Sequence, residues 1–114
     1  MPSDQTKGKP VPLVPPRPEV VRDIVRALAA DTANIQWRQH ALDRMIERDI
    51  TDAMALQVMR KGYVEGSIEA GKRPDEWVVK LADQMKGQRE VGVVVVVVDL
   101  KKLRVITVEW EDLR

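Results

Sequence analysis

The chain has 114 residues, of which 44% are hydrophobic and 32% charged, and its formal net charge is +1. This size and composition are typical of one globular domain and exclude a fibrous or wholly disordered chain. The absence of cysteine excludes disulfide and thiolate chemistry, and a single histidine without cysteine argues against a zinc site. We therefore expect neither a metal nor a cofactor.

The charge is divided unevenly between a proline-rich N-terminal segment and the rest of the chain. Residues 1–18 hold six of the seven prolines, with three cations and one carboxylate, for a net charge of +2. Residues 19–114 therefore sum to −1, so recognition of phosphate would require a local cluster of cations. We predict that 1–18 is a flexible tail that acts as a spacer or, alternatively, as a docking peptide for an aromatic groove.

No apolar run approaches the length that spans a bilayer, the longest being Val93 to Val98. The first residues also lack the apolar core of a secretory signal peptide. These observations predict a cytoplasmic protein without a membrane partner.

The patterns of residues 19–114 predict one α+β domain that starts with helices. Pro18 suits the first turn of a helix over 19–30, whose apolar residues lie on one side and pack on the domain or on a partner. Residues 35–37 alternate like a very short strand or an extended lead-in. We expect the 19–30 helix to be an accessory element outside a core over residues 35–110.

Two further helices follow in close succession. The first runs from about residue 39 to 48, and its apolar stripe is expected to be buried; the stripe comprises Ala41, Leu42, Met45 and Ile46. The second begins after Thr51, an N-cap candidate, and ends in a basic turn before Gly62.

The second half of the chain changes to the alternating pattern of strands. We predict strands at 63–70, 76–84, 91–99 and 103–110. Six consecutive valines suit a central strand covered on both faces. In the last strand, strict alternation places Thr107 on the face opposite Arg104. Helices followed by a mostly antiparallel sheet of about four strands make an α+β fold.

The only histidine lies on the 39–48 helix beside two arginines. His40, Arg44 and Arg48 recur at a spacing of four, which places them on one helical face. An imidazole titrates near neutrality and guanidinium groups match phosphate oxygens, so the group suits cleavage of RNA by its own 2′-hydroxyl. The alternative is a solvated, salt-bridged face with Asp43 and Glu47.

One histidine fills only one proton-transfer role at a time, so other groups must complete the site. Thr107 is a candidate for orienting a phosphate or hydroxyl, and Lys80, Arg104 and Tyr63 are candidates for RNA binding. The alternative is that these are ordinary strand residues, and that the aromatic side chains pack in the core instead of stacking on bases.

The order of motifs resembles a small bacterial family catalogued as domain of unknown function 4258. The resemblance covers roughly residues 35–110 and is carried by two segments and one glycine: the pattern from His40 to Thr51, Gly62, and Val105 to Val108. That family is similar in layout to the RelE, BrnT and barnase-type toxin ribonucleases, in which helices precede a small antiparallel sheet. The resemblance implies a metal-independent endoribonuclease, with His40, Arg44, Arg48 and Thr107 as catalytic candidates.

Two functions from different classes remain open. The first is a toxin-type endoribonuclease that acts on RNA or on the ribosome and is paired with a cognate antitoxin protein. The second is a non-enzymatic interaction module that uses the 19–30 helix and the strand edges for a protein partner or a second copy of the chain. The near-neutral charge of 19–114 counts against the first, because RelE-like toxins are strongly basic.

Overall fold

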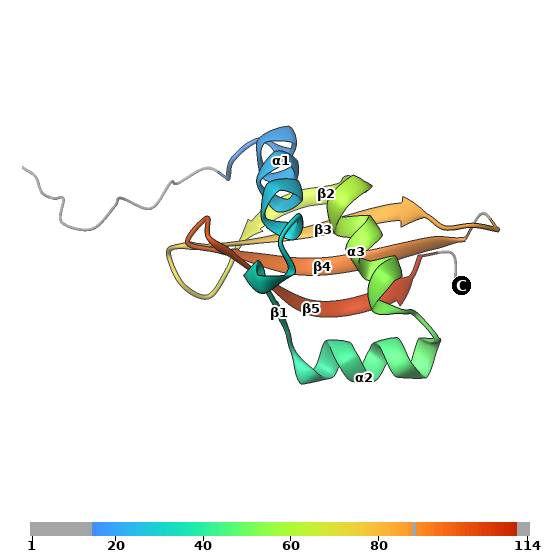
Figure 1. The fold of residues 1–114 in the computed structure, drawn as a ribbon. Coiled ribbons are helices and arrows are strands. Elements are labelled where there is room, and N and C mark those ends of the chain that lie inside the picture. The colour runs from blue at the N-terminus through green and yellow to red at the C-terminus, as the bar shows by residue number, and fades with distance from the viewer. Residues whose placement is uncertain (1–14, 88, 112–114) are drawn as a thin grey trace, which may run out of the picture.

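The computed structural model describes residues 15–87 and 89–111, and within them the fold is α+β (Figure 1). Its helices and strands are α1 (Pro18–Ala29), β1 (Ile35–Trp37), α2 (Gln39–Arg48), α3 (Asp52–Lys61), β2 (Tyr63–Ala70), β3 (Glu76–Gln84), β4 (Glu90–Val98) and β5 (Lys102–Trp110). A short 3₁₀ helix, Thr32–Asn34, joins α1 to β1. Residues 1–14 of the predicted tail lie outside the described residues, and the last tail residue, Pro18, already belongs to α1.

The strands form one sheet in the order β1-β5-β4-β3-β2. The expected number of about four strands was one too few, because β1 joins the sheet as well. It pairs parallel with the start of β5, Ile35 opposite Leu103, whereas every other pairing in the described sheet is antiparallel. Parallel strands need a long connection between them, and the chain between β1 and β5 provides one, because it includes α2, α3 and three strands.

The helices α1 and α3 cover one face of the sheet, and α2 runs beside β5 (Figure 1). The apolar side chains between helices and strands are fully buried, among them Val25, Val58, Val95 and Val105. The 19–30 helix therefore packs on its own domain. No helix of the described residues covers the opposite side of the sheet, which we call the open face.

β4 lies at the centre of the sheet, as predicted, but helices cover it on one side only. Val93, Val95 and Val97 face the helices, while Val94 and Val98 lie half-buried on the open face. The valine run is thus accommodated without a second layer, because long polar side chains of the neighbouring strands shield the open face.

A β-bulge at Ile106 corrects the predicted alternation of β5. Thr107 pairs with Val94, and Arg104 pairs with Val96, so both lie on the open face. Strict alternation had placed them on opposite faces. The extra residue in β5 shifts the alternation by one, which sequence periodicity alone does not reveal.

The expected burial of the α2 stripe was wrong for two of its four residues. Ala41 and Met45 are buried, but Leu42 is 36% exposed and Ile46 is 81% exposed. Because α2 lies at the edge of the sheet, the core reaches only a narrow part of its surface.

The boundaries of α3 agree with the sequence. The Thr51 hydroxyl accepts a hydrogen bond from the Met54 N–H at 3.2 Å, and Gly62 follows the last helical residue. Gly62 has an ordinary negative φ, so its role is to permit close approach: an added Cβ would collide with the carbonyl groups of Val58 and Ala82. Within the described residues, every helix is too short or too polar to cross a membrane.

Candidate functional site

The C-terminal half of α2 is fastened to the edge of β5 by two hydrogen bonds. The Arg48 guanidinium donates to the Val108 carbonyl at 3.0 Å, and the Trp110 indole N–H donates to the Arg48 carbonyl at 2.7 Å. β1 pairs only with the first part of β5, so the rest of β5 is an edge of the sheet. The Val108 carbonyl lies on this edge, and Arg48 supplies its hydrogen-bond donor. The sequence placed Arg48 in the catalytic group, and the structure gives its guanidinium a backbone partner.

The N-terminal end of α2 is open. Its N-cap residue, Arg38, makes no capping hydrogen bond through its side chain, and the first turn has no acidic residue. The main-chain N–H groups of Gln39, His40 and Ala41 meet no acceptor among the described residues. Such a helix end carries a partial positive charge and favours an anion.

His40 is the second residue of this open helix end. Its side chain is exposed and forms no hydrogen bond or ion pair with residues 15–87 or 89–111. Arg38 is also exposed, and its main-chain N–H donates to the Val105 carbonyl at 3.1 Å, which fixes the start of α2 beside β5. The structure thus places Arg38 and His40 at the start of α2, next to β5.

Arg44 lies one turn after His40 and pairs with Glu47 at 2.8 Å. Both side chains are substantially exposed, at 38% and 57%, and an exposed ion pair of this spacing contributes only about 0.3–0.5 kcal/mol. A phosphate can therefore displace Glu47 from Arg44 at low cost. The alternative of a salt-bridged face is present in part: Glu47 pairs with Arg44, whereas Asp43 accepts a hydrogen bond from the Gln39 side chain at 2.9 Å.

The four candidates from the strands share the open face. Tyr63 pairs with Ala82, Glu65 pairs with Lys80, and the bulge adds Thr107 to the same side as Arg104. No hydrogen bond or ion pair among the described residues joins these four to His40 or Arg44. The candidates therefore form two groups, one at the start of α2 and one on the open face.

The two candidate cations of the open face, Lys80 and Arg104, already have carboxylate partners. Lys80 lies 3.0 Å from Glu109 and 2.9 Å from Glu111, and Arg104 lies 3.3 Å from the buried Glu76. Partial burial acts to lower the pKa of Lys80, but its hydrogen bonds to the two carboxylates outweigh this effect and raise the pKa above its usual range. Lys80 is thus held as an ammonium ion.

Tyr63 is tied to a carboxylate as well. Its hydroxyl donates to Glu90 at 2.8 Å, and this bond, with partial burial, raises the pKa of Tyr63 to about 12. A phenol in this state is a poor general base near neutral pH. The three tryptophans, Trp37, Trp77 and Trp110, pack against the core, as the packing interpretation predicted.

Sequence reasoning missed Arg38 as part of the site. The signal was present in the sequence: Arg38 replaces the usual Ser, Thr, Asp or Asn immediately before a helix that has no acid in its first turn. No three His, Asp or Glu side chains in the described parts of the chain lie close enough together to hold a metal ion.

Comparisons with known proteins give one family. A family model described as "Domain of unknown function (DUF4258)" matches residues 37–110, well over half of the chain. The match begins at the last residue of β1 and ends with β5, so α1 lies outside it. No curated protein and no solved structure matches the chain.

Proposed function

The chain belongs to the DUF4258 family, and we propose that it is a metal-independent endoribonuclease of toxin type with its reactive centre at the start of α2. The substrate is RNA, either free or on the ribosome, and a cognate antitoxin protein controls the activity. His40 is the catalytic residue, and Arg38 and Arg44 bind the phosphate.

The observation that carries this proposal is His40, which is exposed and has no partner among the described residues, at a helix N-terminus that Arg38 does not cap with its side chain. A phosphate at this helix end would receive main-chain N–H groups and would lie beside the imidazole. Imidazole is the side chain best suited to proton transfer near neutral pH. An anion site and a proton-transfer group thus coincide on one turn of helix.

Arg44 supports the proposal through its place on the helix. Leu42 and Ile46 line a groove with Thr51 at the start of α3, so this flank of α2 turns toward the covered face of the sheet. His40 and Arg44 lie on the other flank, one turn apart. An RNA strand along that flank would meet His40 and Arg44 in succession without crossing the helices.

In the proposed reaction the RNA 2′-oxygen forms a bond to the adjacent phosphorus, and the bond from phosphorus to the 5′-oxygen breaks. His40 takes the proton of the 2′-hydroxyl, and the helix N–H groups with Arg38 stabilise the charge that develops on the phosphate. Solvent water protonates the leaving 5′-oxygen, and the hydroxide that remains takes the proton back from the imidazolium of His40. Arg48 is a positioning residue that holds α2 against β5. Thr107 belongs to the separate group on the open face and is given no part in this step.

The test is incubation of the purified protein with end-labelled RNA in the presence of EDTA and, in a separate assay, with translating ribosomes in a buffer that contains Mg²⁺. We expect cleavage that leaves 2′,3′-cyclic phosphate ends. His40→Ala is expected to slow cleavage by about 10²- to 10⁴-fold, the usual contribution of a general acid or base. Arg44→Ala is expected to slow it less, by about tenfold.

Arg22→Ala is the matched control for Arg44→Ala. Arg22 is 36% exposed and pairs with Asp23 at 3.1 Å on α1, so the substitution removes the same charge and a similar ion pair elsewhere. It is expected to leave cleavage unchanged. Intact RNA in both assays would overturn the endoribonuclease, and cleavage that survives His40→Ala would remove His40 from the mechanism.

A second candidate function, docking of a protein partner without catalysis, is favoured by the groove between α2 and α3. It has a volume of about 570 Å³, and Leu42, Met45, Ile46 and Ile50 give it an apolar lining. Asp49 and Asp52 add carboxylates to its lining. The complementary partner is an antitoxin-like protein with an apolar side chain flanked by cations.

Titration with the protein encoded beside this gene tests the second candidate. Ile46→Glu places a charge on the most exposed apolar residue of the groove and is expected to weaken binding by at least tenfold. Leu100→Glu, which changes another exposed apolar residue on the β4–β5 turn, is the control. Equal affinities for both variants would rule out the groove as the docking site.

A further inference from the structure

Two loops of the chain meet at one end of the sheet. The β2–β3 loop and the β4–β5 turn lie side by side, and the Asp99 N–H donates to the Asp75 carbonyl at 2.9 Å (Figure 1). The β2–β3 loop carries two consecutive cations, Lys72 and Arg73. Two more follow at the end of the β4–β5 turn, Lys101 and the first residue of β5, Lys102. We call these four residues the cationic end.

A buried carboxylate fixes the shape of the cationic end. Glu76 is only 5% exposed, and one of its oxygens accepts the Arg73 N–H at 3.4 Å while the other accepts Arg104 at 3.3 Å. Its main chain closes the loop: the Glu76 N–H donates to the Arg73 carbonyl and its carbonyl accepts the Gly71 N–H. The loop backbone is therefore held in place before any ligand arrives.

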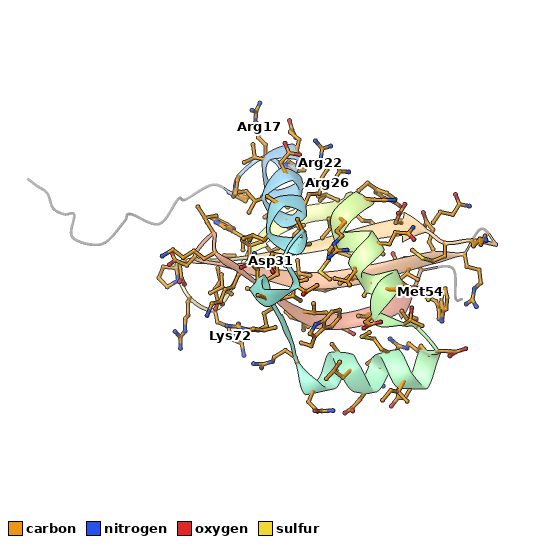
Figure 2. All side chains as sticks on the ribbon, in the orientation of Figure 1. Arg17, Arg22, Arg26, Asp31, Met54 and Lys72 are labelled. Carbon is orange, nitrogen blue, oxygen red and sulfur yellow. The ribbon has the colours of Figure 1, made fainter. Side chains whose placement is uncertain are left out.

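The side chains of the cationic end are exposed and largely free. Lys101 approaches Asp99 only to 3.9 Å, and Lys72, Arg73 and Lys102 form no ion pair with the described residues. Figure 2 places Lys72 at this end of the molecule, far from Met54 on α3. Four cations against the two loop carboxylates, Asp75 and Asp99, leave a local positive charge in a domain that is otherwise slightly acidic.

The cationic end is continuous with the start of α2. Lys102 begins β5, and Val105, three residues later, accepts the main-chain N–H of Arg38. Three residues of strand span about 10 Å. Arg38 and His40 thus lie close enough to Lys102 for one short nucleic-acid strand to reach both.

We propose that the cationic end binds the sugar-phosphate backbone of single-stranded RNA and leads the strand to the open N-terminus of α2. This inference rests on the proposed endoribonuclease for the identity of the nucleic acid. An anionic membrane fits the surface less well, because Leu100 is the one large apolar side chain exposed on the two described loops, and stable membrane binding needs an apolar face as well as charge.

Binding of a 2′-O-methyl RNA oligonucleotide tests the inference separately from catalysis. This RNA lacks the attacking hydroxyl, so it binds without being cut. The test variant is Lys72→Gln/Lys102→Gln, with one substitution in each loop. The control is Lys61→Gln/Lys86→Gln, which removes the same charge from exposed lysines at the end of α3 and in the β3–β4 turn, at the opposite end of β3.

We expect the test variant to bind about tenfold more weakly near 0.15 M salt. The slope of the logarithm of the binding constant against the logarithm of the salt concentration should become less steep by about 1.4, because two phosphate contacts are lost. The control is expected to bind within about twofold of the unmodified chain. Equal weakening in both variants, or no binding of this RNA at low salt, would overturn the inference. Loop-dependent binding to phosphatidylserine vesicles in place of RNA would also overturn it.

The two proposals fail in different ways. RNA binding that depends on Lys72 and Lys102, without cleavage of ordinary RNA, supports the cationic end and overturns the endoribonuclease. Cleavage that requires His40, with binding unaffected by the loop substitutions, supports the endoribonuclease and overturns the cationic end.

Discussion

The two ten-residue helices α2 and α3 follow one another in the chain, but their N-termini are built in opposite ways. At α3 the Thr51 hydroxyl accepts the Met54 N–H, and Asp52 places a negative charge in the first turn. At α2 the corresponding residue is Arg38, which makes no side-chain cap, and the first turn is free of acids. The start of α3 is satisfied internally, whereas the start of α2 is left open to an external anion.

A second difference concerns the C-terminal half of each helix. α3 carries Val58 and Met59, which are fully buried, so packing on the sheet holds it in place. α2 buries only Met45 in its C-terminal half and is held there also by the polar contacts of Arg48. The comparison indicates that both ends of α2 are held on β5, by Arg48 at one end and by the Arg38 N–H at the other, while the first main-chain N–H groups of the helix meet no acceptor among the described residues.

Removal of the anchor should have the largest effect on stability. Arg48→Met keeps much of the apolar stem but removes the donor to Val108, leaving a strand-edge carbonyl without its partner. We expect the free energy of unfolding to fall by about 2 kcal/mol, as measured by urea denaturation. Arg44→Met, on the same helix, is expected to change it by less than about 0.5 kcal/mol. Equal losses would contradict the anchoring role.

Removal of the α3 cap should have a smaller effect. Thr51→Ala leaves the Met54 N–H without its acceptor and should lower the free energy of unfolding by about 1 kcal/mol. Because this helix end has no part in the proposed site, the affinity of the folded variant for RNA should equal that of the unmodified chain. A loss of RNA binding without a loss of stability would show that the two helix ends had been assigned the wrong way round.

Addition of a cap to α2 should have the smallest effect on stability and the opposite sign. Arg38→Ser supplies a capping hydroxyl, and we expect a gain of about 0.5–1 kcal/mol together with slower RNA cleavage. Arg17→Ser is the matched control, because Arg17 is also an arginine N-cap without a side-chain cap, at the start of α1. That control should leave cleavage unchanged. Faster cleavage by Arg38→Ser would contradict an anion site at α2.

The local signals in the sequence were sufficient for most of the fold. Thr51 and Gly62 mark the ends of α3 because capping and close approach depend on the residue at one position. The change from helical to alternating periodicity near Tyr63 marks the start of the sheet. It does so because the spacing of apolar residues within each element reflects which side of that element is buried. Membership of the family follows from the same local patterns.

The remaining features depend on contacts between distant segments. The exposure of Leu42 and Ile46 follows from the place of α2 at the sheet edge, and the face of Thr107 follows from a bulge in its pairing with β4. The partners of Lys80, Arg104 and Arg48 come from strands far away in the chain. Hydrogen-bond partners and strand register are properties of the assembled sheet, so periodicity does not report them.

The sequence by itself determined the class of fold, the order of the elements and the presence of one imidazole among arginines on a short helix. Only the tertiary structure decided which of those arginines have partners, because that depends on the carbonyl and carboxylate groups that folding brings near them. It also decided that two loops separated by a full hairpin place Lys72 and Lys102 at one end of the sheet. Local composition fixes what each segment can form, and packing fixes which charges remain available to a ligand.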